Sequence, residues 1–148
     1  NNRYAISVPL EKQMRIDNVA ARAAGYGFPG IIIDGMDFFS VYEATREAIS
    51  RARVQGPVLL EMKVDRFMPH TTDDDDRRYR PGEEVEEARK RDPITLLRAY
   101  ILEAQLLTEQ QDEEVRRRSR SEVDQATDAA DAAPYPDSST TYDHVYAP

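Results

Sequence analysis

The sequence predicts an α/β fold in which a βαβ unit with parallel strands is followed by a helical region. Two apolar runs, 31–33 and 58–64, are typical of strands, and the apolar positions of 38–53 between them have helical spacing. A strand, a helix and a strand joined by short loops form a crossover that makes the two strands parallel. The 148 residues are enough for one domain with a single core.

The segments before the first strand are shorter and less regular. Residues 1–9 are expected to be the end of a strand running into a loop, because the alternation over 4–8 is loose and Pro9 stops it. A short helix is expected over 17–24, since the glycines of 25–27 would end it.

Turn and capping residues mark the ends of each element of the crossover. The run 31–33 is β-branched and lies between turn residues, which favours a buried strand. Asp37 is a suitable N-cap for the helix 38–53, and Gly56 with Pro57 ends it before the second strand.

Beyond residue 80 the pattern is helical. A first helix is expected over 83–91, and Asp92 followed by Pro93 predicts the start of a second. Thr108 with Gln111 forms a capping box for a third helix, whose basic cluster 116–120 we interpret as a solvated face. From Pro134 the composition predicts little regular structure until 142–146.

Composition excludes several classes of function. A net charge of −8 disfavours nucleic-acid binding, and no apolar run approaches the roughly 20 residues that a membrane helix needs. Without cysteine there is no disulfide framework and no thiolate site, and two histidines nearly exclude a multi-histidine metal centre. No signal peptide is visible. The absence of an initial Met suggests that the chain is part of something longer.

Two segments could carry chemistry. The first, Asn1 to Tyr4, follows a predicted strand end, where open α/β sheets bind ligands. An Asn side-chain oxygen and a nearby carbonyl oxygen suit Mg²⁺, although an Asn pair at a strand end more often serves turn chemistry.

The second segment, 69–80, follows the second predicted strand. It contains His70, which could donate a proton or contact a phosphate, and the aspartate run 73–76. Adjacent aspartates repel each other unless they are solvated, metal-bound or paired with arginines, so a mobile charged loop is the alternative. The segment 34–37 is interpreted as a turn and a helix cap, and the chain has no phosphate-binding glycine motif.

Taken in order, several segments resemble the thiamine-diphosphate-dependent 2-oxo acid dehydrogenases. More narrowly, they resemble the alpha subunit of the decarboxylating first component of the heterotetrameric type. The matching segments are NNRYAIS at 1–7, GYGFPG at 25–30, DGMD at 34–37, VYEATREA at 41–48, PHTT at 69–72, YR at 79–80, RDPI at 91–94 and DHVY at 143–146. The resemblance implies that the βαβ unit is part of a parallel-sheet thiamine-diphosphate-binding fold.

The resemblance also implies roles for single residues. Asn2 would bind Mg²⁺ through its side-chain oxygen and Tyr4 through its backbone carbonyl, while Ile6 would line the cofactor. His70 would be the active-site histidine, contacting the phosphate side of the cofactor and assisting acyl transfer to a lipoyl arm. The loop 65–80 would order over bound cofactor, with supporting residues Arg66, Thr71, Asp74, Tyr79 and Arg80. Thr71 lies where animal relatives carry a regulatory phosphoserine.

Two departures from the family pattern stand out. A Gly-Asp-Gly with the family's metal-binding acid is absent and would precede Asn1, so this piece alone would not complete the metal site. Met68 stands where relatives usually have glycine, and a positive φ there would strain a methionine.

The whole-protein expectations follow from the resemblance. The chain would be the C-terminal part of an alpha subunit that pairs with a beta subunit in an α2β2 heterotetramer and serves the lipoyl domain of an acyltransferase component. A branched-chain 2-oxo acid is favoured as substrate, with pyruvate close behind. The alternative is a non-catalytic remnant that only docks a partner. Expected domain limits are 1–81, 82–133 and 134–148, and the expected location is the bacterial cytoplasm or the mitochondrial matrix.

Overall fold

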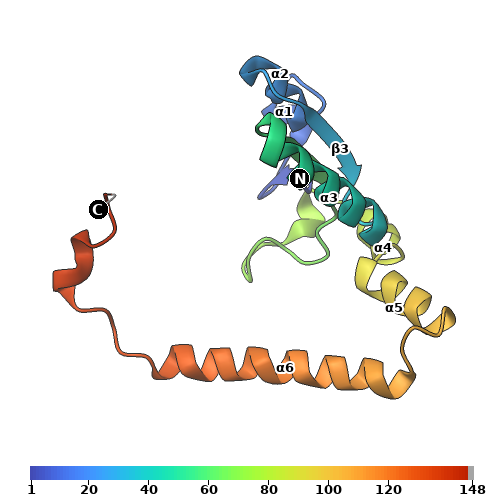
Figure 1. Ribbon diagram of the computed structural model, residues 1–148, viewed down its shortest axis with the longest axis vertical. Coiled ribbons are helices and arrows are strands. Elements are labelled where there is room, and N and C mark those ends of the chain that lie inside the picture. The colour runs from blue at the N-terminus through green and yellow to red at the C-terminus, as the bar shows by residue number, and fades with distance from the viewer. Residues whose placement is uncertain (147–148) are drawn as a thin grey trace. The chain divides into compact units, whose positions relative to one another are not determined.

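The computed structural model describes residues 1–146 and divides into one compact unit over Asn1–Tyr100 and a second that begins at Ile101. The division falls within helix α5, and Figure 1 labels the main elements. The first unit contains, in chain order, β1 (Tyr4–Ala5), β2 (Val8–Pro9), α1 (Leu10–Gln13), η1 (Val19–Arg22), α2 (Ala23–Tyr26), β3 (Gly30–Asp34), α3 (Phe38–Gln55), β4 (Leu59–Lys63), η2 (Asp76–Arg78), α4 (Gly82–Arg89) and the start of α5 (Pro93–Glu103). The domain limits expected from the sequence stay a prediction.

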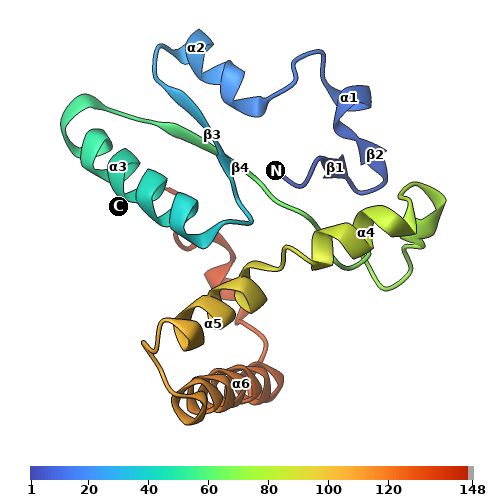
Figure 2. The ribbon, with the colours of Figure 1, turned by 90° about the vertical axis from the view of Figure 1, so that its right-hand side faces the viewer.

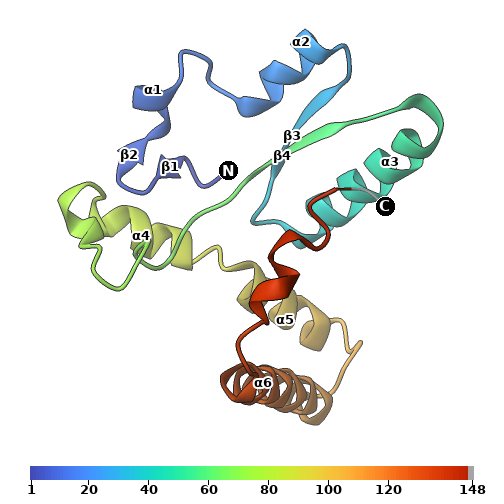
Figure 3. The same ribbon diagram turned by 90° about the vertical axis from the view of Figure 1, so that its left-hand side faces the viewer.

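The predicted βαβ unit is confirmed. Strands β3 and β4 pair in parallel, with Gly30 opposite Leu59 and Asp34 opposite Lys63. Helix α3 makes the crossover and contacts both strands. Figures 2 and 3 show α3 on one side of the strand pair and the N-terminal segment on the other. The carboxyl ends of β3 and β4 therefore lie at one edge of the sheet.

Helix α3 begins as the sequence predicts. The Asp37 carboxylate accepts hydrogen bonds from the backbone N–H of Phe39 at 2.9 Å and of Ser40 at 3.4 Å. The hydrogen bonds from Ser40 hold the pKa of Asp37 below its usual value. The helix runs two residues beyond the predicted end and stops at Gly56, whose φ of 96° suits glycine.

The helix expected over 17–24 has a different form. It starts with the 3-10 turn η1 and continues as the short α2, which Gly27 ends with a φ of 78°. The first turn has a partner 41 residues away, because the Glu61 carboxylate accepts a 2.6 Å hydrogen bond from the backbone N–H of Ala20. A bond from the middle of β4 thus helps to hold the first turn in place.

Glu61 is the one acidic side chain buried in the strand pair, with 4% of its surface exposed. Besides Ala20, its carboxylate accepts hydrogen bonds from Asn1 Nδ2 and Lys63 Nζ, each at 2.6 Å. Burial by itself raises the pKa of Glu61, but the hydrogen bonds from Lys63, Ala20 and Asn1 outweigh it and lower the pKa to about 2. The buried carboxylate is therefore ionised and fully engaged at neutral pH.

The core of the first unit is small. Its buried apolar residues are Ala20, Ala23, Ile33, Met36, Ala48 and Ala88. Helix α5 joins it through an edge-on contact between the rings of Phe39 and Tyr100, with centroids 4.9 Å apart. The predicted start of α5 is confirmed, because the Asp92 carboxylate accepts hydrogen bonds from the N–H groups of Ile94 and Thr95.

The second unit contains α6 (Glu109–Ala132) and η3 (Ser138–Tyr142). The capping box of Thr108 and Gln111 is present at the start of α6. The basic cluster lies on an exposed face, as predicted, in pairs such as Arg117 with Glu114 at 2.6 Å. Little regular structure was expected after Pro134, yet η3 forms because the Asp137 side chain accepts from the N–H of Ser139 at 2.8 Å. Residues 147–148 of the predicted tail lie outside the described residues.

The close approach of β3 to η1 predicts a difference between two glycines. A Cβ on Gly30 would lie 2.1 Å from the carbonyl oxygen of Ala20, whereas one on Gly25 meets nothing within 4 Å. Gly30→Ala should therefore lower the free energy of unfolding by about 2 kcal/mol. Gly25→Ala, in a helix, should raise it by up to about 1 kcal/mol. Denaturant unfolding of the full-length protein measures both, and equal midpoints would contradict the packing described here.

Candidate functional site

The first residue of the chain continues the parallel sheet beyond β4. The Asn1 amino nitrogen donates to the carbonyl oxygen of Met62 at 2.8 Å, and the N–H of Val64 donates to the carbonyl oxygen of Asn1 at 3.1 Å. These two bonds flank Lys63 in the pattern of a parallel ladder. Asn1 thus lies beside β4 on the side away from β3, at the edge where both strands of the two-stranded sheet end. This supports the expectation that a strand ends at Asn1.

Beyond that edge, residues 1–4 form what we call the asparagine turn. The Asn1 side-chain oxygen accepts from the N–H of Arg3 at 2.8 Å, and the Asn2 side-chain oxygen accepts from the N–H of Tyr4 at 3.0 Å. Arg3 is held in the left-handed region with a φ of 67°. The asparagines therefore do serve turn chemistry, in two overlapping side-chain turns.

The hydrogen bonds of the asparagine turn leave its side-chain oxygen atoms able to accept a further partner. A side-chain amide oxygen has two lone pairs, so Asn2 can accept from Tyr4 and still bind a cation. Mg²⁺ prefers six oxygen ligands and is usually held by a few protein oxygens together with phosphate oxygens and water. Among residues 1–146 no group of three His, Asp or Glu side chains could hold a metal. The Asn2 side-chain oxygen and the Tyr4 carbonyl oxygen are the kind of ligand that such an ion uses, and their binding of Mg²⁺ stays a prediction.

The asparagine turn is joined to the segment that follows β4. The Arg3 guanidinium pairs with the Asp65 carboxylate, whose side chain is only 10% exposed. Beyond the turn, β1 and β2 form an antiparallel hairpin, with Tyr4 opposite Pro9. Ile6 lies in its tight turn with a φ of 57°, which is unfavourable for a β-branched residue. Backbone strain of this kind is concentrated at functional sites.

Arg66 connects that hairpin to the loop 65–80. Its guanidinium donates to the carbonyl oxygen of Ile6 at 3.2 Å and to the Tyr79 hydroxyl at 2.6 Å. Tyr79 in turn donates to Asp74 Oδ2 at 2.5 Å, and the backbone N–H of His70 donates to the same oxygen at 2.8 Å. A continuous set of hydrogen bonds therefore runs from Ile6 to the backbone of His70.

These bonds perturb the two acidic groups in opposite directions. The hydrogen bond from Tyr79, followed by that from the N–H of His70, lowers the pKa of Asp74. Burial and the hydrogen bond to Asp74 raise the pKa of Tyr79. At neutral pH the pair is therefore an ionised carboxylate and a neutral phenol, which is the combination that the geometry requires.

Arg80 closes the other end of the loop and is buried, with 3% of its surface exposed. It donates to the carbonyl oxygen of Arg66 at 2.7 Å and to Glu84 Oε1 at 3.2 Å. The Tyr4 hydroxyl also donates to Glu84, and the Arg80 guanidinium lies 5.3 Å from the centre of the Tyr4 ring. Burial and Glu84 raise the pKa of Tyr4. The residue proposed to bind metal through its carbonyl is thus anchored by its ring.

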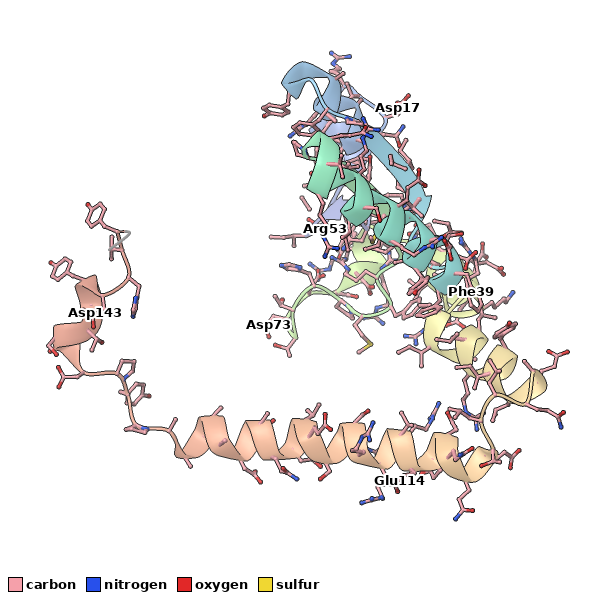
Figure 4. The ribbon with its side chains drawn as sticks, viewed as in Figure 1. Asp17, Phe39, Arg53, Asp73, Glu114 and Asp143 are labelled. Carbon is pink, nitrogen blue, oxygen red and sulfur yellow. The ribbon has the colours of Figure 1, made fainter. Side chains whose placement is uncertain are left out.

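The aspartate run is mostly paired with arginines, which is one of the arrangements that the sequence left open. Asp75 pairs with Arg77 at 2.7 Å, and Asp76 lies 3.8 Å from the buried Arg80. Asp73 is exposed, and Figure 4 shows it at the outer end of the loop. The loop is therefore a folded structure with an exposed tip.

The structure thus brings together Asn2, Tyr4, Ile6, Arg66, Asp74, Tyr79 and Arg80. His70 and Thr71 are held by their backbones: the Thr71 carbonyl accepts from the N–H of Asp74 at 3.2 Å, and both residues are exposed. Met68 does not have a positive φ, so the strain considered for it does not arise. Arg3, Glu61, Asp65 and Glu84 also belong to this region, and sequence reasoning missed them. An acidic residue within the apolar run 58–64 was the signal for Glu61.

Comparisons with known proteins identify the family of this chain. The family model described as "Dehydrogenase E1 component" matches residues 1–139. The chain belongs to this family. The resemblance seen in the sequence is therefore confirmed, and the βαβ unit with its helical C-terminal region is consistent with part of a thiamine-diphosphate-binding fold.

Individual E1 relatives are similar over the whole chain or most of it. The 2-oxoisovalerate dehydrogenase subunit alpha of Bacillus subtilis is 45% identical over 148 residues, covering 99% of this chain and 45% of the relative. The mitochondrial 2-oxoisovalerate dehydrogenase subunit alpha of Homo sapiens is 41% identical over 148 residues, covering 99% and 33%. The pyruvate dehydrogenase E1 component subunit alpha of Staphylococcus epidermidis is 42% identical over 133 residues, covering 88% and 36%.

The chain thus spans less than half the length of these curated E1 relatives. Both bacterial and mitochondrial proteins are among them. Within residues 1–146, no helix has the length and apolar character needed to cross a membrane.

The bonds to Asp74 predict how the loop responds to substitution. Asp74→Ala removes the acceptor shared by Tyr79 and the His70 backbone, so the loop should open more often. Trypsin cleavage after Arg77 and Arg78, whose side chains are 84% and 83% exposed, should then accelerate about fivefold or more.

Asp73→Ala is the matched control for this measurement, because Asp73 is an exposed neighbour in the same run. Its cleavage rate should stay within about twofold of the unmodified protein. Equal acceleration in both variants would mean that the bonds to Asp74 do not hold the loop.

Proposed function

We propose that this chain forms part of the alpha subunit of a 2-oxo acid dehydrogenase first component. The reaction is the decarboxylation of a 2-oxo acid on thiamine diphosphate with Mg²⁺, followed by transfer of the acyl group to lipoamide. The observation that carries the proposal is the meeting of the asparagine turn and the His70 loop at the carboxyl edge of the parallel sheet, within a chain of the E1 family.

In this proposal Asn2 and Tyr4 hold Mg²⁺ through oxygen atoms, and Ile6 contributes to the wall beside the cofactor. Thiamine diphosphate, when bound, supplies the electron sink that accepts the electron pair left by departing CO₂. The chain itself binds, orients and excludes water. Its anchored turn fixes the two oxygen ligands, and Arg3 pairs with Asp65 beside them.

His70 is the proposed catalytic residue. Its backbone is fixed by Asp74, while the residue itself is exposed and can meet substrate and lipoyl groups from solution. An imidazole can give a proton to the thiolate that is released when the acyl group is transferred to one sulfur of the disulfide of a lipoyl arm. Arg66, Tyr79, Asp74 and Arg80 act as supporting residues, because they determine where the loop lies. Thr71, beside His70, is exposed and belongs to the same loop.

A branched-chain 2-oxo acid is the favoured substrate. The 2-oxoisovalerate relative from Bacillus subtilis aligns with 99% of the chain, whereas the pyruvate relative aligns with 88%. Comparing turnover of 3-methyl-2-oxobutanoate with that of pyruvate by the full-length alpha subunit and its partner tests this preference. A higher kcat/KM for pyruvate would reverse it.

Exposed apolar side chains support a beta-subunit partner. Along one face of α3, Phe38, Tyr42 and Ile49 are about half exposed, and a hollow of about 520 Å³ lies among them. Large exposed apolar patches mark interaction surfaces on soluble proteins. We assign this face to contacts within the assembled E1 component.

The catalytic role of His70 predicts a loss of turnover that the other histidine of the chain does not share. In the full-length alpha subunit with its partner, His70→Ala should lower acyl transfer to lipoamide by about 100-fold or more. His144→Ala is the matched control, since His144 is also exposed and lies in the second unit, and it should stay within about twofold. Activity retained in His70→Ala would remove His70 from the mechanism. An unmodified assembly that shows no decarboxylation with thiamine diphosphate and Mg²⁺ would favour the non-catalytic docking module.

A further inference from the structure

We propose that Glu61 is a positioning residue for the asparagine turn and that it acts on Mg²⁺ binding through the side chain of Asn1. This inference rests on the proposed function, because it concerns the same metal ligands, Asn2 and Tyr4. Glu61 lies in the middle of β4 and does not itself reach Asn2 or Tyr4 in any hydrogen bond described above. Its influence therefore has to pass through another residue.

The first step is the orientation of the Asn1 amide. Glu61 Oε1 accepts a 2.6 Å hydrogen bond from Asn1 Nδ2. An ionised carboxylate accepts hydrogen bonds and cannot donate them, so only the NH₂ end of the Asn1 amide can face it. The oxygen end of the amide must then point away from Glu61.

The second step is what that oxygen does. Asn1 Oδ1 accepts the 2.8 Å hydrogen bond from the N–H of Arg3, which has a φ of 67°. A left-handed conformation is unfavourable for a residue with a side chain, so it persists where a specific bond supports it. If the Asn1 amide were reversed, two donors would face each other at Arg3 and that support would be lost.

The third step connects Arg3 to the metal ligands. Arg3 is the residue between Asn2 and Tyr4, so its backbone conformation determines how the Asn2 side chain and the Tyr4 carbonyl are placed relative to each other. The sequence of contacts is therefore Glu61 to Asn1, Asn1 to Arg3, and Arg3 to both ligands. We call this set of contacts the Glu61 relay.

The other end of Glu61 is fixed independently. Glu61 Oε2 accepts from the N–H of Ala20 in η1, and its side chain is only 2% exposed. Burying an ionised carboxylate in a strand is costly unless donors surround it, and an apolar side chain would pack there at lower cost. A glutamate suits this position in the strand because its carboxylate can accept hydrogen bonds from η1 and from Asn1 at the same time.

Glu61→Gln tests the relay with little change in volume. The glutamine amide has one oxygen and one NH₂ group, so its NH₂ group, itself a donor, must face other donors, either those of Asn1 and Lys63 or the N–H of Ala20. Lys63→Met is the matched control, because it removes a donor to the same Oε1 atom and leaves the bond to Asn1 in place.

The measurement is Mg²⁺ affinity of the full-length alpha subunit assembled with its partner and freed of cofactor. Calorimetric titration with MgCl₂ at a fixed thiamine diphosphate concentration gives the half-saturating Mg²⁺ concentration for each variant. Glu61→Gln should raise this concentration about tenfold, and Lys63→Met should change it less than about twofold. At saturating Mg²⁺ the kcat of Glu61→Gln should return to within about twofold of the unmodified enzyme, since no group that touches substrate is altered.

Asn1→Ala completes the test, because it interrupts the relay at an exposed residue and leaves Glu61 its bonds to Ala20 and Lys63. It should weaken Mg²⁺ binding about as much as Glu61→Gln, and the double variant should be no weaker than either single variant. If the two losses multiply, or if Mg²⁺ affinity is unchanged in Asn1→Ala, the relay is overturned. If Glu61→Gln does not fold, Asn1→Ala alone decides by the same criterion. An unmodified assembly that binds neither Mg²⁺ nor thiamine diphosphate would instead refute the proposed function.

Discussion

The candidate site depends on the parallel alignment of Asn1 with β4. Two backbone hydrogen bonds, to Met62 and from Val64, bring the start of the chain to the carboxyl edge of β3 and β4. This alignment places the asparagine turn beside Asp65, Arg66 and the loop that follows, where the Arg3–Asp65 pair and the bond from Arg66 to Ile6 add to it. Loops that bind ligands are commonly carried by a rigid sheet in this way, and here two hydrogen bonds decide which loops meet.

Most charged side chains in this region are paired with a side chain of opposite charge. Arg66 and Arg80 each donate to a carbonyl oxygen, lie near a carboxylate and contact the Tyr4 ring, and both side chains are largely buried. The guanidinium group suits this task because it is planar and offers five donors. The loop is thereby stabilised by charge-assisted hydrogen bonds more than by apolar burial, which agrees with the small core of the first unit.

Local features could be predicted from the sequence, because their causes lie within a few residues. The cap of α3 at Asp37, the start of α5 at Asp92 and the capping box at Thr108 all depend on side chains bonding to a backbone two or three residues away. The two strands could be predicted for a similar reason, since β-branched and apolar runs between turn residues favour them wherever they occur.

The missed features depend on partners that are distant in the chain. The η1 turn is bonded to Glu61, 41 residues later, and the left-handed Arg3 is supported by Asn1, which itself donates to Glu61. No short pattern reports such contacts. The identities of the site residues came from the resemblance to a family, whereas the reasons they lie together became visible only in the structure.

The long separation between Asn1 and its partners has a consequence for how the site is made. Asn1 forms hydrogen bonds with Glu61, Met62 and Val64, which lie about 60 residues later in the chain. The ion pair of Arg3 with Asp65 spans a similar separation. Contacts between residues so far apart in the sequence are slow to form, because closing the intervening loop costs conformational entropy. The turn can therefore take shape only after β4 has been synthesised and has paired with β3. A nascent chain released before residue 64 would consequently lack the partners that hold the asparagine turn in place.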